Sequence, residues 1–296
     1  MAIVVSKIIG GLGNQMFQIA AGMAVAKRCS SPLLLDISAL RKYRKHHGYL
    51  LPEVFKTSPE LASKWKLIFL LKSDYRKVLY GPITGQVSLR QNTRNIVCYQ
   101  LHQGYSQDFD KLSGPCYLSG YWQSEKFFVG IEDEIRNLFS FNEPADSVNA
   151  EILSKICSCN AVSLHVRRGD YVTEQDTNVF HGICSWDYYK AAIEYVEAKV
   201  PDAKFFGFSD DPEWLRNKAK GMHSLEVVDI NHGPKSYLDM YLMTRCKHHI
   251  IANSSFSWWG AYLGLNEQKI VVAPSPWLRG DPEGIKDIYC NGWTVF

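Results

Sequence analysis

The sequence has no long hydrophobic run, no strong net charge and no clustered cysteines. No stretch approaches the roughly 18 consecutive apolar residues that a membrane span needs. The formal net charge is only +3, too weak to give a bulk field for nucleic acid, so we expect no nucleic-acid partner. The eight cysteines contain no C-x-x-C pair, which disfavours a zinc clamp. Their scatter favours free thiols, and the first residues lack the features of a signal peptide, so we expect a cytoplasmic protein.

The composition is that of a soluble globular protein. The chain has 296 residues, of which 46% are hydrophobic and 21% charged, and this length favours two domains. Residues 3–9 form a β-branched run, a glycine turn follows at 10–13, and apolar residues recur at helical spacing over 14–27. A second strand predicted at 33–36 completes the opening of a right-handed βαβ unit. Further strands are predicted at 96–101 and 116–121, and helices at 59–71 and 125–138.

The second half alternates strands and helices regularly. We place a boundary in Glu143–Asp146, with Asp146 or Ser147 capping a helix that runs to about Cys157. Strands are predicted at 161–166, 204–209, 225–228, 249–252 and 270–273, and helices at 186–200, 212–220, 237–246 and 258–265. Such alternation indicates a mostly parallel, doubly wound sheet. We therefore predict an α/β protein with two Rossmann-like domains, 1–145 and 146–296, facing a central cleft.

Two arginines follow the buried strand at 161–166. The segment reads His-Val-Arg-Arg-Gly-Asp at 165–170, so Arg167 and Arg168 stand at the carboxyl end of an inner strand. Open α/β sheets bind ligands at that edge, and arginine grips phosphate with a forked set of donors. The segment therefore favours a pyrophosphate ligand, and a pair of structural salt bridges is the alternative.

The glycine turn Gly-Gly-Leu-Gly-Asn-Gln-Met at 10–16 resembles a dinucleotide fingerprint only in part. Counted from Gly11, the third small residue of G-x-G-x-x-G/A falls on Met16, which argues against a dehydrogenase. What remains is a turn whose amides suit an anion at a helix N-terminus. Asn14 is expected at the cap, where it either offers its amide to a ligand or only caps the helix.

Two further strand ends carry polar side chains. Asp210 and Asp211 follow the strand at 204–209, where they can accept hydrogen bonds from a base, cap the next helix or, least favoured, hold a metal. The segment Asn-Ser-Ser-Phe-Ser at 253–257 gathers three hydroxyls and an amide at another strand-to-helix junction. A helix cap needs one such side chain, so this cluster favours a phosphate or ribose site.

The four motifs together resemble those of the bacterial α-1,2-fucosyltransferases, in the same order and over nearly the whole chain. They are Gly-Gly-Leu-Gly-Asn-Gln-Met-Phe-Gln at 10–18, His-Val-Arg-Arg-Gly-Asp-Tyr at 165–171, Ser-Asp-Asp at 209–211 and Ala-Asn-Ser-Ser-Phe-Ser-Trp-Trp-Gly at 252–260. The resemblance implies a GT-B-like fold, GDP-β-L-fucose as donor, a terminal β-galactoside as acceptor, and neither a metal nor another cofactor. It places the enzyme in the synthesis of surface polysaccharide such as O-antigen.

The resemblance also implies roles for individual residues. Arg167 is the main pyrophosphate contact, Asn14 supports the donor, and His165 and Asp170 line the same site. Further donor contacts are implied at the glycine turn, at the second arginine, at the acidic pair (guanine) and at the hydroxyl cluster (phosphates): Gly11, Gly13, Arg168, Asp210, Asp211, Asn253, Ser254, Ser255 and Ser257.

The chemistry expected is inversion by direct displacement, because the donor bond is β and the product bond is α. Arg167, Arg168 and helix amides would stabilise the departing phosphate. Asp170 is one candidate for the proton acceptor, although it can equally orient the arginines. The alternatives are a fucosyltransferase of other regiochemistry, such as α-1,6, and a non-catalytic nucleotide-sugar-binding relative.

One basic and aromatic stretch lies outside these motifs. Lys64-Trp65-Lys66-Leu67-Ile68-Phe69-Leu70-Leu71-Lys72, with the basic run at 41–47 before it, has a composition suited to an anionic membrane surface. The sequence favours the other interpretation, a core helix with solvated basic flanks. Peripheral contact with the inner membrane face is the alternative.

Overall fold

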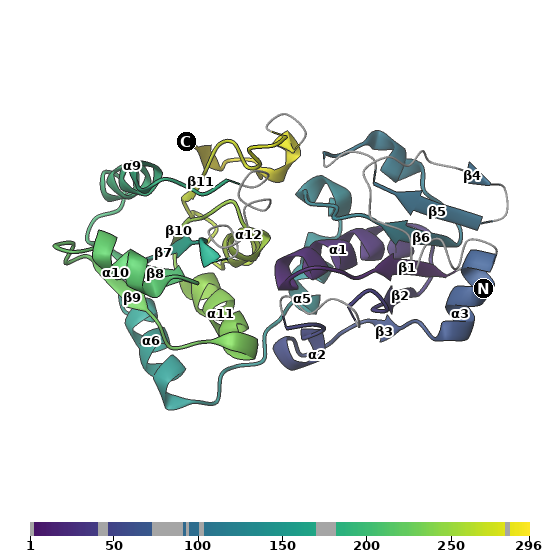
Figure 1. The fold of residues 1–296 in the computed structure, drawn as a ribbon, viewed down its shortest axis with the longest axis horizontal. Helices are drawn as coiled ribbons and strands as arrows, with labels where there is room; N and C mark the ends of the chain where they lie inside the picture. Colours follow the sequence, from purple (N-terminus) through teal and green to yellow (C-terminus); the bar gives the residue numbers. More distant parts are fainter. Residues whose placement is uncertain are drawn as a thin grey trace. The chain divides into compact units, whose positions relative to one another are not determined.

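The computed structural model describes residues 3–40, 47–72, 91–92, 95–100, 104–169, 182–281 and 285–296. The chain divides into two compact units, Met1–Asn142 and Glu143–Phe296, each with its own sheet and core (Figure 1). The division falls after Asn142 rather than after residue 145. Among the described residues, none of the helices combines the length and apolarity that crossing a bilayer requires.

The first unit contains a six-stranded sheet of order β3-β2-β1-β6-β5-β4. Its pairs are parallel, except that β4 is antiparallel to β5. The strands are β1 Val4–Lys7, β2 Leu33–Asp36, β3 Glu60–Leu61, β4 Gln91–Asn92, β5 Asn95–Tyr99 and β6 Cys116–Ser119. All residues of β1 and β6 are buried, as expected for central strands with both faces covered. β1 and β6 are parallel neighbours at the centre of the sheet, so the residues that follow these two strands lie at the same edge.

The helices of the first unit differ from the prediction at their ends. They are α1 Leu12–Arg28, α2 Leu51–Val54, α3 Lys64–Leu71 and α5 Glu132–Leu138, with 3-10 helices η2 Gln107–Lys111 and η3 Glu125–Phe128. The helix predicted at 125–138 is broken, because Gly130 takes φ +83° between η3 and α5. The helix predicted at 59–71 is shorter, since its first residues form β3 and Ser63 caps α3.

The second unit contains a fully parallel sheet of order β12-β11-β10-β7-β8-β9. Counted from β9, this is the Rossmann order 3-2-1-4-5-6, with its switch point between β7 and β10. The strands are β7 Asn160–Val166, β8 Ala203–Ser209, β9 Leu225–Val228, β10 His248–Ile250, β11 Val271–Ala273 and β12 Thr294–Val295. At the switch point the buried side chains of Ser163 and His249 hydrogen-bond, with 2.8 Å between Oγ and Nδ1.

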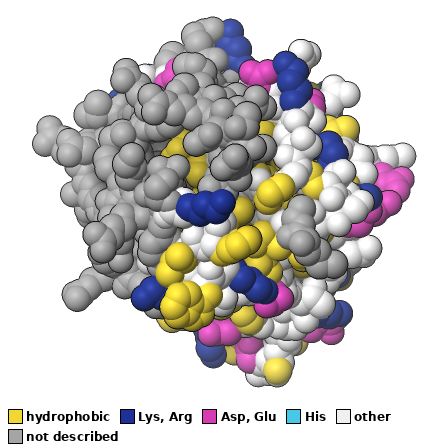
Figure 2. Space-filling view, turned by 90° about the vertical axis from the view of Figure 1, so that its right-hand side faces the viewer, with side chains coloured by type: hydrophobic (Ala, Val, Ile, Leu, Met, Phe, Trp, Pro, Cys, Tyr) yellow, Lys and Arg dark blue, Asp and Glu magenta, His cyan; other side chains and the backbone are white. Residues whose placement is uncertain are grey.

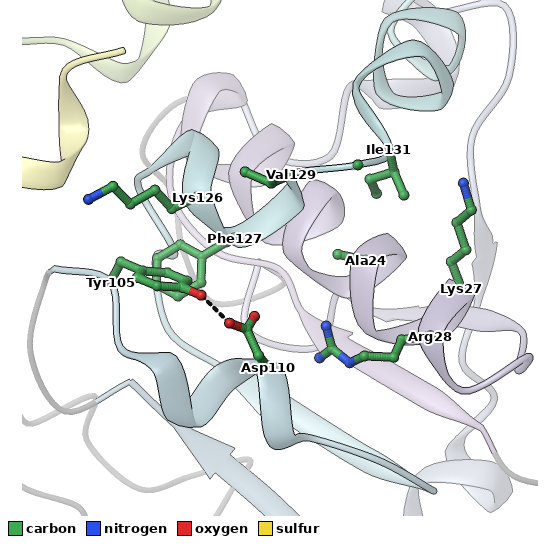
Figure 3. A pocket seen from close by; sticks show the side chains of 10 residues that line it. Ala24, Lys27, Arg28, Tyr105, Asp110, Lys126, Phe127, Val129 and Ile131 are labelled. Carbon is green, nitrogen blue, oxygen red and sulfur yellow. Dashed lines mark hydrogen bonds between the residues drawn. The ribbon is translucent and has the colours of Figure 1, made fainter. Parts of the chain in front are cut away.

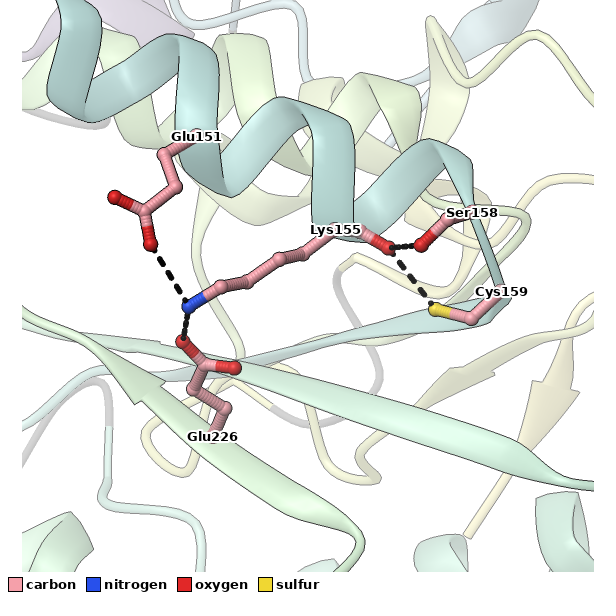
Figure 4. A network of polar contacts seen from close by, with 5 residues as sticks. All are labelled: Glu151, Lys155, Ser158, Cys159 and Glu226. Atoms are coloured by element: carbon pink, nitrogen blue, oxygen red, sulfur yellow. Dashed lines mark hydrogen bonds and ion pairs between the residues drawn. The ribbon is translucent and has the colours of Figure 1, made fainter.

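Helices lie on both faces of this second sheet (Figure 1). They are α6 Ser147–Cys157, α9 Trp186–Glu197, α10 Pro212–Lys218, α11 Tyr237–Arg245 and α12 Ser255–Tyr262, with 3-10 helices η4 Gly233–Ser236 and η5 Lys286–Ile288. Of the two predicted caps, Asp146 and Ser147, it is Asp146 that caps α6. Its Oδ1 accepts a hydrogen bond from the backbone N–H of Asn149 at 2.9 Å. On the surface, Lys155 of α6 pairs with Glu151 at 3.4 Å and with Glu226 of β9 at 3.0 Å (Figure 4). Such exposed ion pairs add little to stability, so the stability of this unit comes mainly from its buried core.

Candidate functional site

The arginines and the acidic pair meet at the carboxyl edge of the second sheet. Val166 of β7 lies beside Ser209 of β8 in parallel register, so the residues that follow each strand are neighbours. Arg167 pairs with Asp210 at 3.1 Å between Nη1 and Oδ2. The backbone N–H of Arg168 donates to the other oxygen of the same carboxylate at 2.8 Å. One carboxylate therefore fixes both the side chain of the first arginine and the backbone of the second.

Arg168 is held by a second set of contacts. Its Nε donates to Oδ2 of Asp211 at 3.2 Å, and its guanidinium lies 4.2 Å from the ring centroid of Trp214. Asp211 also caps α10, because its Oδ1 accepts from the backbone N–H of Trp214 at 3.1 Å. The capping role weighed for the acidic pair is thus confirmed for Asp211, and both carboxylates face cations. No group of three metal-binding side chains occurs in the part of the chain that the structure describes.

Glycine at position 169 lets the backbone approach the acidic pair. A Cβ there would lie 2.8 Å from Oδ2 of Asp210, closer than van der Waals contact allows. A larger residue would therefore displace the carboxylate that holds Arg167. Asp170, the candidate proton acceptor, lies outside the described residues.

His165, near the end of β7, is buried as a neutral imidazole. It is 5% exposed, its ring centroid lies 5.6 Å from that of Phe256, and its Nδ1 has no hydrogen-bond partner among the described residues. Burial, followed by the charge of Arg167, lowers the pKa of His165 to about 3. A general base works best with a pKa near the working pH, so the environment argues against proton transfer by this side chain. Its ring packs against Phe256 instead.

The junction between β10 and α12 uses most of its polar side chains for its own structure. Ser254 caps the helix by accepting from the backbone N–H of Phe256 at 3.3 Å. Asn253 donates from Nδ2 to the carbonyls of Gly182 and Trp277, at 3.1 and 3.2 Å. The helix therefore starts at Ser255, three residues before the predicted Trp258, since the cap is Ser254.

Ser257 is more deeply buried than Ser254 and Ser255. Its hydroxyl is fully buried and donates toward the carbonyls of Ala252 and Ser254, at 3.3 and 3.2 Å. The hydroxyl is thus used by the backbone at the start of α12, and a phosphate contact by Ser257 stays a prediction. The half-buried Ser255 and the first backbone amides of α12 remain the donors at this edge.

These groups all border the switch point of the second sheet. The arginines follow β7, the serines follow β10, and these two strands are hydrogen-bonded neighbours whose onward connections run to opposite sides. Doubly wound sheets bind ligands in the crevice outside such strand ends. Guanidinium groups from one strand end and helix amides from the next suit an anionic ligand such as a diphosphate.

The glycine turn of the first unit takes a different form from the prediction. Helix α1 begins at Leu12 with Gly11 at its cap, so the prediction that Asn14 caps the helix is wrong. The turn is tighter than expected because Gly10 adopts φ +84°, and Asn14 becomes the third helical residue. Gly13 consequently lies buried in the first turn of the helix.

Asn14 is held by a residue that the motifs do not contain. Its Oδ1 accepts from Nε2 of Gln123 at 2.6 Å. Gln123 follows β6, and Asn14 follows β1, so the pair joins the carboxyl ends of two neighbouring parallel strands of the first sheet. The signal for Gln123 in the sequence was its place just after a predicted strand, but no pattern singled it out.

The other polar residues of this motif hold the turn itself. Gln15 donates from Nε2 to the carbonyls of Gly10 and Gly48, both at 2.9 Å, and Oε1 of Gln18 accepts from the backbone of Ile9 at 2.9 Å. Both glutamine side chains are buried, so they build the turn that places Asn14.

A pocket of about 500 Å³ lies in the first unit at the opposite end of α1 (Figure 3). Lys27, Arg28 and Lys126 border it, together with Tyr105, which donates to Asp110. Arg28 is anchored by its donation to the carbonyls of Phe109 and Leu112, so it is part of the scaffold. Because the pocket lies at the C-terminal end of α1 and the glycine turn at its N-terminal end, the two sites are separate.

Comparison with known proteins identifies the family. The family model described as glycosyl transferase family 11 matches residues 5–296. An alpha-1,2-colitosyltransferase from Escherichia coli is 34% identical over 94% of this chain and 93% of its own length. The O-antigen biosynthesis glycosyltransferase WbnK from Escherichia coli is 33% identical over 93% of this chain and 95% of its own.

A solved structure shares the fold. The crystal structure of Se-Met fucosyltransferase NodZ from Bradyrhizobium covers 88% of this chain and 91% of its own, with a TM-score of 0.50 and 14% identity. The two Rossmann-like units agree with the predicted GT-B-like α/β class. The predicted enzyme class and family are likewise confirmed: the chain is a glycosyltransferase and belongs to glycosyl transferase family 11.

Proposed function

We propose that this enzyme transfers L-fucose from GDP-β-L-fucose to the 2-hydroxyl of a terminal β-galactose in a bacterial surface polysaccharide. The observation that carries the proposal is the arginine pair held by Asp210 and Asp211 beside the switch point of the second sheet. Two relatives support it, one named for α-1,2 transfer and one for O-antigen biosynthesis.

The proposed mechanism is inversion by direct displacement. As the bond between fucose and phosphate breaks, negative charge grows on the diphosphate. Arg167 stabilises that charge, and Arg168 and the amides of α12 add to the same field. The fixed ion pairs with the aspartates hold the guanidinium groups in place before the reaction, so little reorganisation is needed. The proton acceptor for the galactose hydroxyl is not His165, whose pKa lies near 3.

A second donor is favoured by one of the relatives. The colitosyltransferase is as similar to this chain as the O-antigen glycosyltransferase, at 34% against 33% identity. Colitose is L-fucose without its 3-hydroxyl, so the same diphosphate contacts serve both donors. The two donors, GDP-fucose and GDP-colitose, differ only in their sugar.

The test is a transfer assay with both donors. Purified enzyme is incubated in EDTA with GDP-fucose or GDP-colitose and a panel of β-galactosides, and the linkage of each product is determined by NMR. We expect an α-1,2 product in EDTA, with one donor preferred. A product with another linkage would overturn the regiochemistry, and calorimetry showing no binding of GDP would overturn the whole proposal.

A further inference from the structure

Helix α3 exposes two large aromatic side chains. Trp65 is 78% exposed and Phe69 is 77% exposed, the highest values among the large hydrophobic residues that the structure describes. They are four residues apart and therefore lie on the same side of the helix. Leu61 of β3, before the helix, is also exposed, at 42%. We call Trp65 and Phe69 the aromatic ridge.

The other side of α3 forms part of the core. Leu67, Leu70 and Leu71 are buried and pack in one cluster with Val5 and Tyr117 of the central strands. The helix is therefore anchored by its leucines, and its fold does not require the aromatic ridge. The prediction of a core helix is right for one side only. Two large aromatic side chains exposed together on one side of a helix are the kind of apolar surface that marks an interaction site.

Lysines surround the aromatic ridge. Lys64, Lys66 and Lys72 are all exposed. Lys66 pairs with Glu60 at 3.3 Å, but both side chains are largely in solvent, so the pair is screened. Figure 2 looks onto the side of the molecule where α3 lies in Figure 1, and it shows hydrophobic side chains next to Lys and Arg side chains. The surface thus combines interfacial aromatics with positive charge.

We propose that α3 docks this enzyme on an anionic phospholipid bilayer. Trp and Phe prefer the boundary between headgroups and acyl chains, and lysines beside them attract anionic headgroups. The helix has only eight residues, so it lies in the interface plane and does not cross the bilayer. The lysines around the ridge match an anionic lipid surface in charge. This docking is independent of the donor chemistry and goes beyond the proposed function.

The test is co-sedimentation of the full chain with vesicles at low salt. Vesicles of phosphatidylcholine alone are compared with vesicles of equal parts phosphatidylcholine and phosphatidylglycerol. We expect binding to the anionic vesicles only. Each lysine near an anionic surface contributes roughly fivefold in affinity, so Lys64→Glu/Lys66→Glu/Lys72→Glu should lower the affinity at least about a hundredfold. Trp65→Ser/Phe69→Ser should lower it at least about tenfold.

Matched variants control for charge and exposed hydrophobicity elsewhere. Lys56→Glu/Lys204→Glu/Lys220→Glu makes the same change of charge at exposed sites outside α3. Val148→Ser/Leu265→Ser removes exposed apolar side chains from the second unit. Both controls should bind as the wild type does. All variants should keep wild-type turnover of a soluble galactoside, which separates docking from the proposed transfer reaction.

Quenching by brominated lipid locates the contact. The chain has eight tryptophans, and we expect brominated anionic vesicles to quench a component of their fluorescence that Trp65→Phe removes. Absence of binding by the wild type, or equal binding by the α3 variants, would overturn the proposal. So would a dimer that Trp65→Ser/Phe69→Ser dissolves without any binding to vesicles, since the ridge would then join two copies of the chain.

Discussion

At the scale of single residues, the site depends on how its charges are held. Each arginine has its own carboxylate: Arg167 pairs with Asp210, and Arg168 with Asp211. The side chains are only partly exposed, at 26% and 24% for the first pair and 20% and 36% for the second. Partial burial strengthens the electrostatic field that these groups exert on a ligand. The aspartates hold the arginine side chains in place even before a ligand binds.

The first prediction concerns Arg167. Arg167→Ala should reduce kcat about 100- to 1000-fold, the cost of removing one donor that stabilises a developing oxyanion. Arg167→Lys should recover only part of the rate, because an ammonium lacks the forked geometry. The measurement is turnover of GDP-fucose alongside urea unfolding. Arg136→Ala in the first unit is the control and should keep the rate; near-normal turnover of folded Arg167→Ala would refute the assignment.

The second prediction concerns Gly169. Gly169→Ala should push the carboxylate of Asp210 aside, because the new methyl group would otherwise lie 2.8 Å from its Oδ2. The end of a side chain moves at little cost, so the free energy of unfolding should change by less than about 1 kcal/mol. The rate should fall about tenfold as Arg167 loses its partner. Asp210→Asn removes the same ion pair without a clash and should match that loss; a rate unchanged in both would show that the pair does not position Arg167.

At the scale of elements, a buried polar chain joins α6, the loop after β9 and α11. Nδ2 of Asn149 donates to Oδ1 of Asn231 at 3.0 Å, and Nδ2 of Asn231 donates to Asp239 at 2.8 Å. Burial first, and then the negative charge of Asp229, raises the pKa of Asp239 to about 7. The carboxyl of Asp239 is therefore protonated in the folded protein under conditions where an unfolded chain would ionise it.

The third prediction follows from that pKa. An unfolded aspartate titrates near pH 4, so between about pH 4 and pH 7 the folded state holds a proton that the unfolded state has lost, and stability falls as pH rises. Asp239→Asn removes this titration and should flatten the slope by roughly 1 kcal/mol per pH unit in this range. Chemical unfolding at pH 5, 6 and 8 measures it. Asp187→Asn, at an exposed position of α9, is the control and should keep the wild-type slope between pH 5 and pH 8; equal slopes in wild type and Asp239→Asn would contradict the prediction.

The sequence predicted the long elements well and the short ones poorly. β7 and β8 start within one residue of their predicted positions, because inner parallel strands are continuous apolar runs. β3 and β4 have two residues each, too few for any pattern. The start of α12 was misplaced by three residues, since several serines competed as caps and only the backbone decides which one is used.

Much of the candidate site was predictable as residue types, but its contacts were not. Strand ends marked the arginines, the aspartates and the serines. The pairing of Arg167 with Asp210 depends on the register of β7 against β8, which no local pattern encodes. The stacking of Trp214 on Arg168, the bond from Gln123 to Asn14 and the burial of Ser257 likewise depend on packing between distant segments.

At the scale of the whole molecule, two units have separate cores. Each unit has its own sheet, and the site proposed for the diphosphate is built from the second unit alone. A ligand that binds one folded unit stabilises that unit by mass action, by about 2.7 kcal/mol at a concentration of 100 times its dissociation constant. Chains with several domains also need not unfold in one step. GDP should therefore act unequally on the two units.

The fourth prediction is that GDP protects the second unit selectively. Hydrogen exchange should slow in β7, β8 and β10 when GDP is added, whereas exchange in β1 and β6 should change much less. In calorimetry, GDP at 100 times its dissociation constant should raise the midpoint temperature of unfolding of the second unit by roughly 5–10 °C. Arg167→Ala should lose most of both effects, and Arg136→Ala should retain them. Equal protection of both sheets would show that GDP couples the two units, and protection of β1 and β6 alone would move the diphosphate site to the glycine turn.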